Sequence, residues 1–229
     1  MSAEPLASPL ASRKPTPRTN AGAPFWAWAI IAPMVLAMVF WLFKLDWRAN
    51  WPAGLLVLVT IFTVSFPTAS RARHPILLPV PLELGIALFV FGSLFVGETL
   101  DFYDRIWWWD LLLHGMSGIL LSAIGLLVAF GLGGRELKPR VAFLFAPMLA
   151  MSVGTLWEFF EYGIEQNFGI LMQTPKVSGG SGLDDTMGDL IANAVTAVLV
   201  VTYGWVQTQP HREFGMPAWV RTVLDSRQR

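Results

Sequence analysis

Long apolar runs separated by short polar breaks fill most of the chain. A helix needs about 20 apolar residues to cross a hydrocarbon core about 30 Å thick. Six runs have or approach this length: 25–44, 51–67, 76–97, 110–131, 141–164 and 186–207. The pattern predicts an all-α fold, a polytopic membrane helix bundle with six transmembrane helices in residues 25–207.

The flanking segments have a different composition. Residues 1–24 are rich in Pro, Ser and Ala and contain no apolar run, so we expect a disordered tail. In residues 208–229, apolar positions after Pro217 line one side of a short helix, which we expect to lie on the membrane surface. The chain has no Cys, which excludes thiolate metal sites, and its net charge of +0 gives no support for a nucleic-acid partner.

The Lys and Arg residues are unevenly divided between the two sides of the membrane that six spanning helices would separate. Four of the 16 Lys and Arg residues lie on one side: Lys44, Arg48, Arg105 and Lys176. The other twelve lie on the side of the two termini. Because Lys and Arg concentrate in cytoplasmic loops, we expect both termini in the cytoplasm.

Acidic and histidine side chains recur at helical spacing near the external ends of the last three predicted helices. Residues three or four positions apart share a helix face. The three stripes are Asp110 with His114, Glu158 with Glu161 and Glu165, and Asp185 with Asp189 and Asn193. They reach a similar depth, about 6–10 Å at 1.5 Å per residue, so we expect them to meet. Glu165 and Asp184 are expected to be ordinary acids at helix ends.

A divalent cation would accommodate such a cluster. Buried carboxylates must pair, bind a proton or bind a cation, and only Arg105 and Lys176 are basic near this end. We predict that five side chains bind the metal directly: His114, Glu158, Glu161, Asp185 and Asp189. Asp110 and Asn193 are predicted to support these ligands from behind. Oxygen ligands with one imidazole suit Mg²⁺, Mn²⁺, Fe²⁺ or Zn²⁺. No residue is assigned a catalytic role.

These motifs resemble those of the VanZ-like and YjdF-like inner-membrane proteins of bacteria. The resemblance rests on Asp110-x3-His114, on Glu161 and on Asp185-x3-Asp189-x3-Asn193, and covers about residues 100–205. Trp157–Glu158 is more similar to the YjdF-like version, whereas the Gly usual after the Asn is absent. The resemblance implies a bacterial cytoplasmic (inner) membrane and an association of VanZ-like proteins with glycopeptide-antibiotic tolerance, but no defined reaction.

Three functional interpretations fit the pattern. In the first, the cation pocket acts on a membrane lipid or lipid-linked molecule, as a metal-dependent hydrolase or transferase. In the second, the acids form the pathway of an ion- or proton-coupled transporter. The inner halves of the last three helices are apolar, and Glu83 is the one deep acid of the third. In the third, the protein is a non-catalytic accessory subunit that binds a protein partner in the membrane.

Overall fold

The fold is an all-α bundle of membrane-spanning length. The computed structural model describes residues 23–71, 78–134, 137–173, 181–208 and 218–227, and within them every element is a helix. Six helices are long and apolar enough to cross a membrane, as predicted. They are α1 (Phe25–Lys44), α2 (Trp47–Ser70), α3 (Val80–Val90) with its continuation η1 (Phe91–Thr99), α5 (Trp109–Gly133), α6 (Pro139–Phe168) and α7 (Gly182–Thr208).

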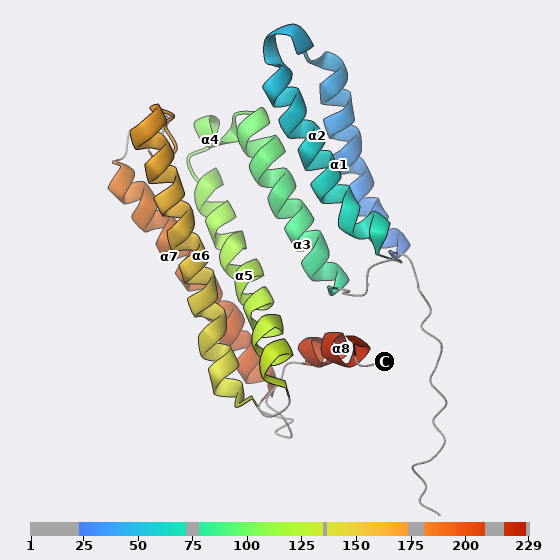
Figure 1. Cartoon of the computed structure of the whole chain (residues 1–229), viewed down its shortest axis with the longest axis vertical. Coiled ribbons are helices and arrows are strands. Elements are labelled where there is room, and N and C mark those ends of the chain that lie inside the picture. Colours follow the sequence, from blue (N-terminus) through green and yellow to red (C-terminus); the bar gives the residue numbers. More distant parts are fainter. Residues whose placement is uncertain (1–22, 72–77, 135–136, 174–180, 209–217, 228–229) are drawn as a thin grey trace, which may run out of the picture.

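Two short helices mark the opposite ends of the bundle. Helix α4 (Phe102–Arg105) joins η1 to α5, and α8 (Ala218–Arg227) follows α7. Figure 1 shows them at opposite ends of the long helices, which we call the α4 end and the α8 end. The predicted tail 1–24 falls outside the described residues except for its last two positions.

Helix boundaries differ from the predicted ones where local chemistry intervenes. Helix α2 begins at Trp47 because the Asp46 side chain accepts a hydrogen bond from the Arg48 N–H at 3.1 Å. A kink at Asn50, with φ −128° and ψ 34°, then separates this first turn from the remainder. Helix α6 extends to Phe168 and ends where Gly169 adopts a left-handed φ of 67°.

The second half of the third spanning helix is a π-helix. Segment η1 packs against α5, and the Trp109 indole donates a hydrogen bond to the Gly92 carbonyl at 3.3 Å. A Cβ atom on Gly92 would lie 3.3 Å from a methyl carbon of Leu113, so this glycine permits a close approach. The widened turn therefore positions η1 beside the start of α5, where the first acidic stripe begins.

Helices α5, α6 and α7 form a closely packed unit. A Cβ atom on Gly118 would overlap the Asn193 carbonyl and the Thr196 hydroxyl of α7. A Cβ atom on Gly125 would lie 2.8 Å from Cα of Ala146 on α6. Such small residues let helix backbones approach within a membrane, where lipid supplies no hydrophobic driving force between helices.

The α8 end of the bundle contains the largest apolar core. Val220 and Val223 of α8 are buried in a cluster with Leu126 and Phe130 of α5 and with Phe143 of α6. The rings of Phe130 and Phe143 meet edge to face, with centroids 6.4 Å apart. Figure 1 shows α8 beside the end of α5, lying crosswise to the long helices. Helix α8 is thus packed into the bundle through its apolar side.

A buried ion pair joins α2 to α3 near the same end. The Arg71 guanidinium contacts the Glu83 carboxylate, with side-chain exposures of 13% and 8%. Arg71 also donates to the Leu78 carbonyl at 3.1 Å. The deep acid of the third spanning helix therefore has a basic partner.

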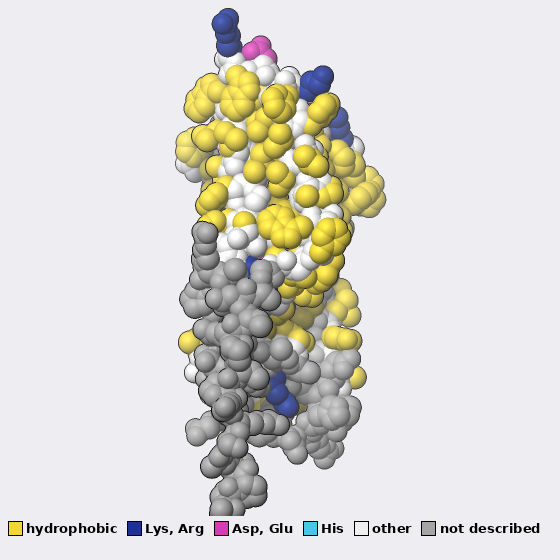
Figure 2. Space-filling model, turned by 90° about the vertical axis from the view of Figure 1, so that its right-hand side faces the viewer, with side chains coloured by type: hydrophobic (Ala, Val, Ile, Leu, Met, Phe, Trp, Pro, Cys, Tyr) yellow, Lys and Arg dark blue, Asp and Glu magenta, His cyan; other side chains and the backbone are white. Residues whose placement is uncertain are grey.

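Most of the outer surface is apolar. Figure 2 shows hydrophobic side chains covering one face of the molecule, with basic side chains at the end of that face. On α1 and α2, side chains such as Leu36, Phe40 and Phe62 are more than 60% exposed. Soluble proteins rarely expose such a continuous apolar surface, whereas a surface facing lipid has this character.

Candidate metal centre

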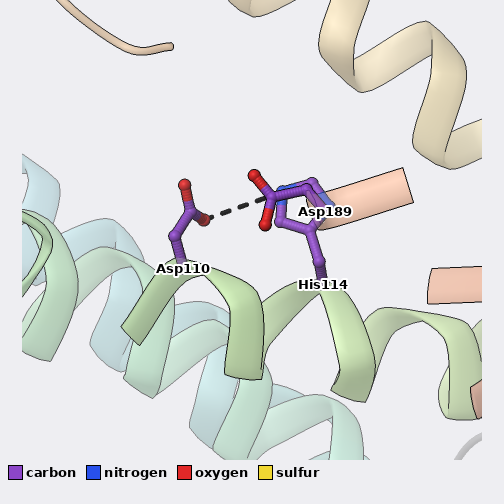
Figure 3. Close-up of side chains that lie close together, drawn as sticks. All are labelled: Asp110, His114 and Asp189. Atoms are coloured by element: carbon purple, nitrogen blue, oxygen red, sulfur yellow. Dashed lines mark ion pairs between the residues drawn. The ribbon is translucent and has the colours of Figure 1, made fainter. Parts of the chain in front are cut away.

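The three polar stripes meet at the α4 end of the α5–α6–α7 unit. Asp110 and His114 project from successive turns of α5, and Asp189 approaches them from α7 (Figure 3). One ligand atom from each of these residues lies within 4.8 Å of the others. His114 and Asp189 are buried, and Asp110 is half-buried. The geometry is that of a compact group able to hold a metal ion.

The imidazole of His114 lies between acids from two helices. Its Nε2 atom is 3.6 Å from Oδ1 of Asp110 and 3.8 Å from Oε1 of Glu158 on α6. Both distances exceed that of a normal hydrogen bond. Nδ1 of the same ring is buried and has no hydrogen-bond partner among the described residues. The His114 ring therefore lies between the acids of α5 and α6 but forms a normal hydrogen bond with neither.

Glu158 is held from one side by the segment that follows α6. Gln173 donates from Nε2 to Oε2 of Glu158 at 3.3 Å, and also to Thr186 Oγ1 on α7 at 2.8 Å. The other oxygen, Oε1, is buried without a hydrogen-bond partner among the described residues. Gln173 thus ties α6 to α7 while one Glu158 oxygen faces His114.

Glu161 is anchored by an aromatic side chain on its own helix. Trp157 donates its indole N–H to Oε1 of Glu161 at 2.7 Å. Oε2 is buried and has no partner within the described chain. The carboxylates of Asp110, Glu158 and Asp185 lie close enough to repel a negative charge on Glu161. Glu161 therefore belongs to the same cluster as the compact group.

The stripe of α7 contributes two acids and an amide. Asp189 Oδ2 is buried without a partner in the part of the chain that is described. Asp185, one turn earlier and half-buried, lies close enough to Glu158 and Asp110 for their negative charges to repel one another. Asn193, one turn later, donates to Ser117 Oγ on α5 at 2.9 Å. The stripe thus continues from a partly accessible acid to a buried amide that fixes α7 against α5.

Glu165 and Asp184 have local roles at helix ends. Glu165 Oε2 accepts hydrogen bonds from the backbone N–H groups of Met172 and Gln173, at 3.1 and 2.9 Å. Ser181, which precedes α7, receives the Asp184 N–H at 3.2 Å and donates to its carboxylate at 2.7 Å. A Ser side chain that accepts the backbone N–H three residues later caps a helix N-terminus. Ser181 is therefore the capping residue of α7.

A tyrosine from α4 borders the cluster. The Tyr103 hydroxyl lies 3.0 Å from Ser93 Oγ of η1, and a Cβ atom on Gly97 would overlap the Tyr103 ring. Burial raises the pKa of Tyr103, and the nearby carboxylates of Asp110, Glu98 and Glu161 raise it further. The phenol is therefore protonated at neutral pH and presents a neutral polar group to the cluster.

Within the described ranges, basic side chains do not neutralise the cluster. Among the described residues, no Lys or Arg forms an ion pair with Asp110, Glu158, Glu161, Asp185 or Asp189. Arg105 pairs instead with Asp101 at 3.0 Å, and both side chains are more than half exposed. Lys176 lies outside the described residues. Within the part of the chain that is described, protons or a bound cation are what can balance the charge on these carboxylates.

The structure brings the predicted residues together and adds others. The compact group contains two predicted ligands, His114 and Asp189, together with Asp110, for which the sequence predicted a supporting position. Glu158, Glu161 and Asp185 surround it, and their assignment as ligands stays a prediction. Sequence reasoning missed the partners that orient the acids. Only Trp157, four residues before Glu161, could have been found from helical spacing.

Comparisons with known proteins agree with the membrane architecture. A family model described as "Predicted membrane protein (DUF2238)" matches residues 26–210. An uncharacterized protein from Thermotoga maritima is 30% identical over 114 residues, which are 50% of this chain and 56% of that relative. The chain thus matches little more than half the length of this relative. No solved structure matches the chain.

Proposed function

The chain belongs to the family of predicted membrane proteins DUF2238, and we propose that its buried cluster binds a divalent cation. The observation that carries the proposal is the group of Asp110, His114 and Asp189, whose ligand atoms lie within 4.8 Å of one another. Imidazole donors suit Fe²⁺ and Zn²⁺, and carboxylates suit Mg²⁺ and Mn²⁺, so the mixed set fits all four ions.

Unpaired buried oxygens support a ligand over a purely structural network. Glu158 Oε1, Glu161 Oε2 and Asp189 Oδ2 have no hydrogen-bond partner among the described residues. A buried polar atom left unsatisfied costs about 1–3 kcal/mol, and more if it is charged. One bound cation would satisfy several of these atoms together. A network that served helix packing alone would pair its own donors and acceptors.

The membrane orientation is part of the proposal. Described basic residues at the α8 end include Arg71, Lys138 and Arg140, whereas Lys44, Arg48 and Arg105 lie at the α4 end. When the other Lys and Arg residues are assigned to a side by their place in the sequence, more of them fall on the side of the α8 end, which favours a cytoplasmic α8 end. The cluster then lies at the external face. A bacterial inner-membrane location and a closer relation to VanZ-like or YjdF-like proteins belong to the same proposal.

The substrate that the site suits best is a lipid or lipid-linked molecule. The cluster lies within about three turns of the α4 ends of the spanning helices, and Asp185 is only half-buried. Trp157 is 46% exposed although its N–H reaches the buried Glu161, so a short distance separates the cluster from the outer surface of α6. A divalent cation supplies Lewis acidity toward a phosphoryl or carbonyl oxygen. Hydrolysis or group transfer is the proposed reaction class.

The transporter interpretation has less support. A relay needs titratable groups on the other half of the bundle, and there Glu83 is paired with Arg71. Beyond the cluster, α5 meets α7 at Gly118 and α6 at Gly125 through close packing. These contacts favour a site that is reached from the α4 end only. An accessory role with a protein partner remains the alternative if no ligand binds.

Metal analysis of the purified full-length chain tests the proposal. The protein in detergent is incubated with Mn²⁺ or Zn²⁺, dialysed, and its metal content measured by mass spectrometry. The double variant Asp110→Asn/Asp189→Asn removes two carboxylates of the compact group and is expected to lose the bound metal. Asp101→Asn is the matched control, because Asp101 lies at the same end, is exposed, and has a φ of 58° that Asn also adopts.

Three outcomes separate the alternatives. Retention of metal by the wild type and by Asp101→Asn, with loss in the double variant, supports the proposal. Equal metal content in the wild type and the double variant contradicts it, as does a wild-type protein that binds neither ion. Far-UV circular dichroism and size-exclusion chromatography establish that each variant is helical and monodisperse before its metal content is compared.

A further inference from the structure

We infer that Gln173 is a positioning residue of the metal centre and couples ion binding to the segment that folds back after α6. The inference rests on the proposed function and extends it to the regulation of the same site. The fold-back segment comprises residues 169–173, which follow the end of α6 at Phe168. It has no acidic or histidine side chain, so it acts on the ion through other residues.

Backbone hydrogen bonds hold the fold-back segment against α6. Oε2 of Glu165 accepts the N–H groups of Met172 and Gln173, at 3.1 and 2.9 Å. The apolar side chains of Ile170 and Leu171 are more than 50% exposed, whereas the Gln173 side chain is buried, at 8% exposure. Glutamine is among the residues that are mostly exposed in proteins. The segment therefore inserts its one polar side chain into the bundle and leaves apolar ones outside.

The amide of Gln173 holds Glu158 by one of its carboxylate oxygens. Nε2 of Gln173 lies 3.3 Å from Oε2 of Glu158 and 3.2 Å from the carbonyl oxygen of the same residue. It also donates to Oγ1 of Thr186 on α7, at 2.8 Å. Because an amide NH2 group has two protons, these three acceptors use its full donor capacity. The Gln173 side chain is thus fixed between α6 and α7, and it keeps Oε2 of Glu158 in place.

The other oxygen of Glu158 faces the compact group. Oε1 is 3.8 Å from Nε2 of His114, is buried, and has no hydrogen-bond partner among the described residues. Glu158 is not a member of the compact group itself and contacts it through His114. A carboxylate beside a ligating imidazole is typical of the groups that orient metal ligands. The contacts therefore run from the candidate ligand His114 through Glu158 to Gln173 and the fold-back segment.

These contacts link ion binding to the position of the fold-back segment. A cation held by the compact group attracts the Glu158 carboxylate and keeps it in the orientation that accepts the hydrogen bond from Gln173. Conversely, release of Gln173 leaves the carboxylate free to turn away from His114. Because linkage is reciprocal, the factor by which the held segment raises ion affinity equals the factor by which the ion stabilises the held segment.

The Mn²⁺ affinity of the full-length chain tests the positioning role. Gln173→Met keeps a side chain of similar length but removes the NH2 group, and it is expected to lower the affinity about 10–100-fold. Gln166→Met is the matched control, because Gln166 is exposed near the end of α6, and it is expected to leave the affinity unchanged. Thr186→Val removes the oxygen that accepts from Gln173 and should lower the affinity, whereas Thr186→Ser, which keeps a hydroxyl, should retain it.

Hydrogen exchange followed by mass spectrometry tests the coupling, which a purely structural role of Gln173 would not produce. The backbone N–H groups of Met172 and Gln173, which are bonded to Glu165, report on the fold-back segment. In the wild type, saturating Mn²⁺ is expected to slow exchange in peptides that cover residues 169–173, by about the factor by which Gln173→Met lowers the affinity. In Gln173→Met, saturating Mn²⁺ is expected to leave exchange in these peptides unchanged.

The outcomes separate the coupling from the proposed function. Mn²⁺ binding by the wild type without any change in exchange at residues 169–173 would overturn the coupling and leave the proposed function intact. Equal Mn²⁺ affinities in the wild type and Gln173→Met would do the same. A wild type that binds neither Mn²⁺ nor Zn²⁺ would overturn both, and Zn²⁺ replaces Mn²⁺ in every measurement if it alone binds. Because exchange is compared in the wild type with and without the ion, an unfolded variant does not obscure the result.

Discussion

Asn193 of α7 donates a hydrogen bond to Ser117 of α5, with Nδ2 and Oγ 2.9 Å apart although 76 positions separate them in the chain. Asn193 is fully buried, and its side chain also lies against Gly154 of α6. One amide therefore contacts all three helices that carry the cluster, one turn beyond Asp189. This arrangement sets the spacing of the helices on which the candidate ligands depend.

Replacement of Asn193 by Ala should destabilise the protein by about 0.6–1.7 kcal/mol, the range of hydrogen bonds between membrane helices. Thermal unfolding in detergent, followed by circular dichroism, measures the loss. Asn167→Ala is the control, because Asn167 is exposed and, among the described residues, donates to the Gly163 carbonyl of its own helix alone. Equal losses of thermal stability in the two variants would show that the hydrogen bond between α5 and α7 does not contribute more than a local one.

The packing of α5 on α7 predicts opposite effects of the same substitution at two glycines. Gly118→Ala should destabilise by about 1–3 kcal/mol, because its Cβ atom would overlap Asn193 and Thr196. For Gly163→Ala on α6, no described residue outside its own helical turn lies within 4 Å of the added atom, so this change should stabilise by up to about 1 kcal/mol through helix propensity. Unfolding temperatures that moved in the same direction would contradict this.

The Arg71–Glu83 pair should behave as a buried ion pair. Arg71→Met leaves the Glu83 carboxylate buried at 8% exposure without its partner and should cost about 3–5 kcal/mol. The double variant Arg71→Met/Glu83→Gln should recover part of this loss in chemical unfolding. Arg105→Met, which breaks the exposed pair with Asp101, should cost less than about 1 kcal/mol. Equal losses at the two arginines would be inconsistent with the burial difference.

The Trp157 indole should matter for metal binding more than for folding. Trp157→Phe keeps an aromatic ring but removes the N–H that orients Glu161. Loss of such an orienting group typically lowers metal affinity about 10–100-fold. Titration with Mn²⁺ measures the change. Trp47→Phe removes an indole hydrogen bond to the Leu42 carbonyl at the same end of the bundle and should leave affinity unchanged. Unaltered affinity in Trp157→Phe would remove the orienting role.

Tyr103 should remain protonated at alkaline pH. Burial raises its pKa, and the carboxylates of Asp110, Glu98 and Glu161 add to the rise, because a phenolate beside them would be repelled. Since a raised pKa keeps the proton to higher pH, Tyr103 should not contribute to phenolate absorbance up to about pH 11, one unit above the usual tyrosine value. The wild type and Tyr103→Phe should therefore show the same absorbance rise near 295 nm. A smaller rise in Tyr103→Phe would refute this.

Much of the fold was predictable because a membrane restricts what a chain can do. Length and apolarity were enough for the six spanning helices, since a lipid environment leaves helices as the simplest way to satisfy backbone groups. The π-helical turns of η1 and the kink at Asn50 were not predictable. They depend on contacts with other helices, such as Trp109 with Gly92, that leave no local sequence pattern.

For the candidate site, helical spacing predicted which acids share a face, and the structure places His114 close to Glu158. Spacing gave no information about the groups that orient them. Gln173 lies beyond the end of α6 and reaches Glu158 only because the chain turns back there. Asp110 was expected to support His114 without binding the metal, but its carboxylate is itself one of the three candidate ligands of the compact group. Whether an acid binds directly or supports another ligand depends on the direction of its side chain within one helical turn, which sequence spacing does not determine.

The position of α8 has a consequence for the order of assembly. Val220 and Val223 complete a core formed with Leu126 and Phe130 of α5. Because synthesis proceeds from the N-terminus, α5 enters the membrane before the segment that covers this part of it exists. The apolar surface at its end is thus uncovered until α8 is made and docks. Insertion of the spanning helices and completion of their core are therefore separate events in the biogenesis of this protein.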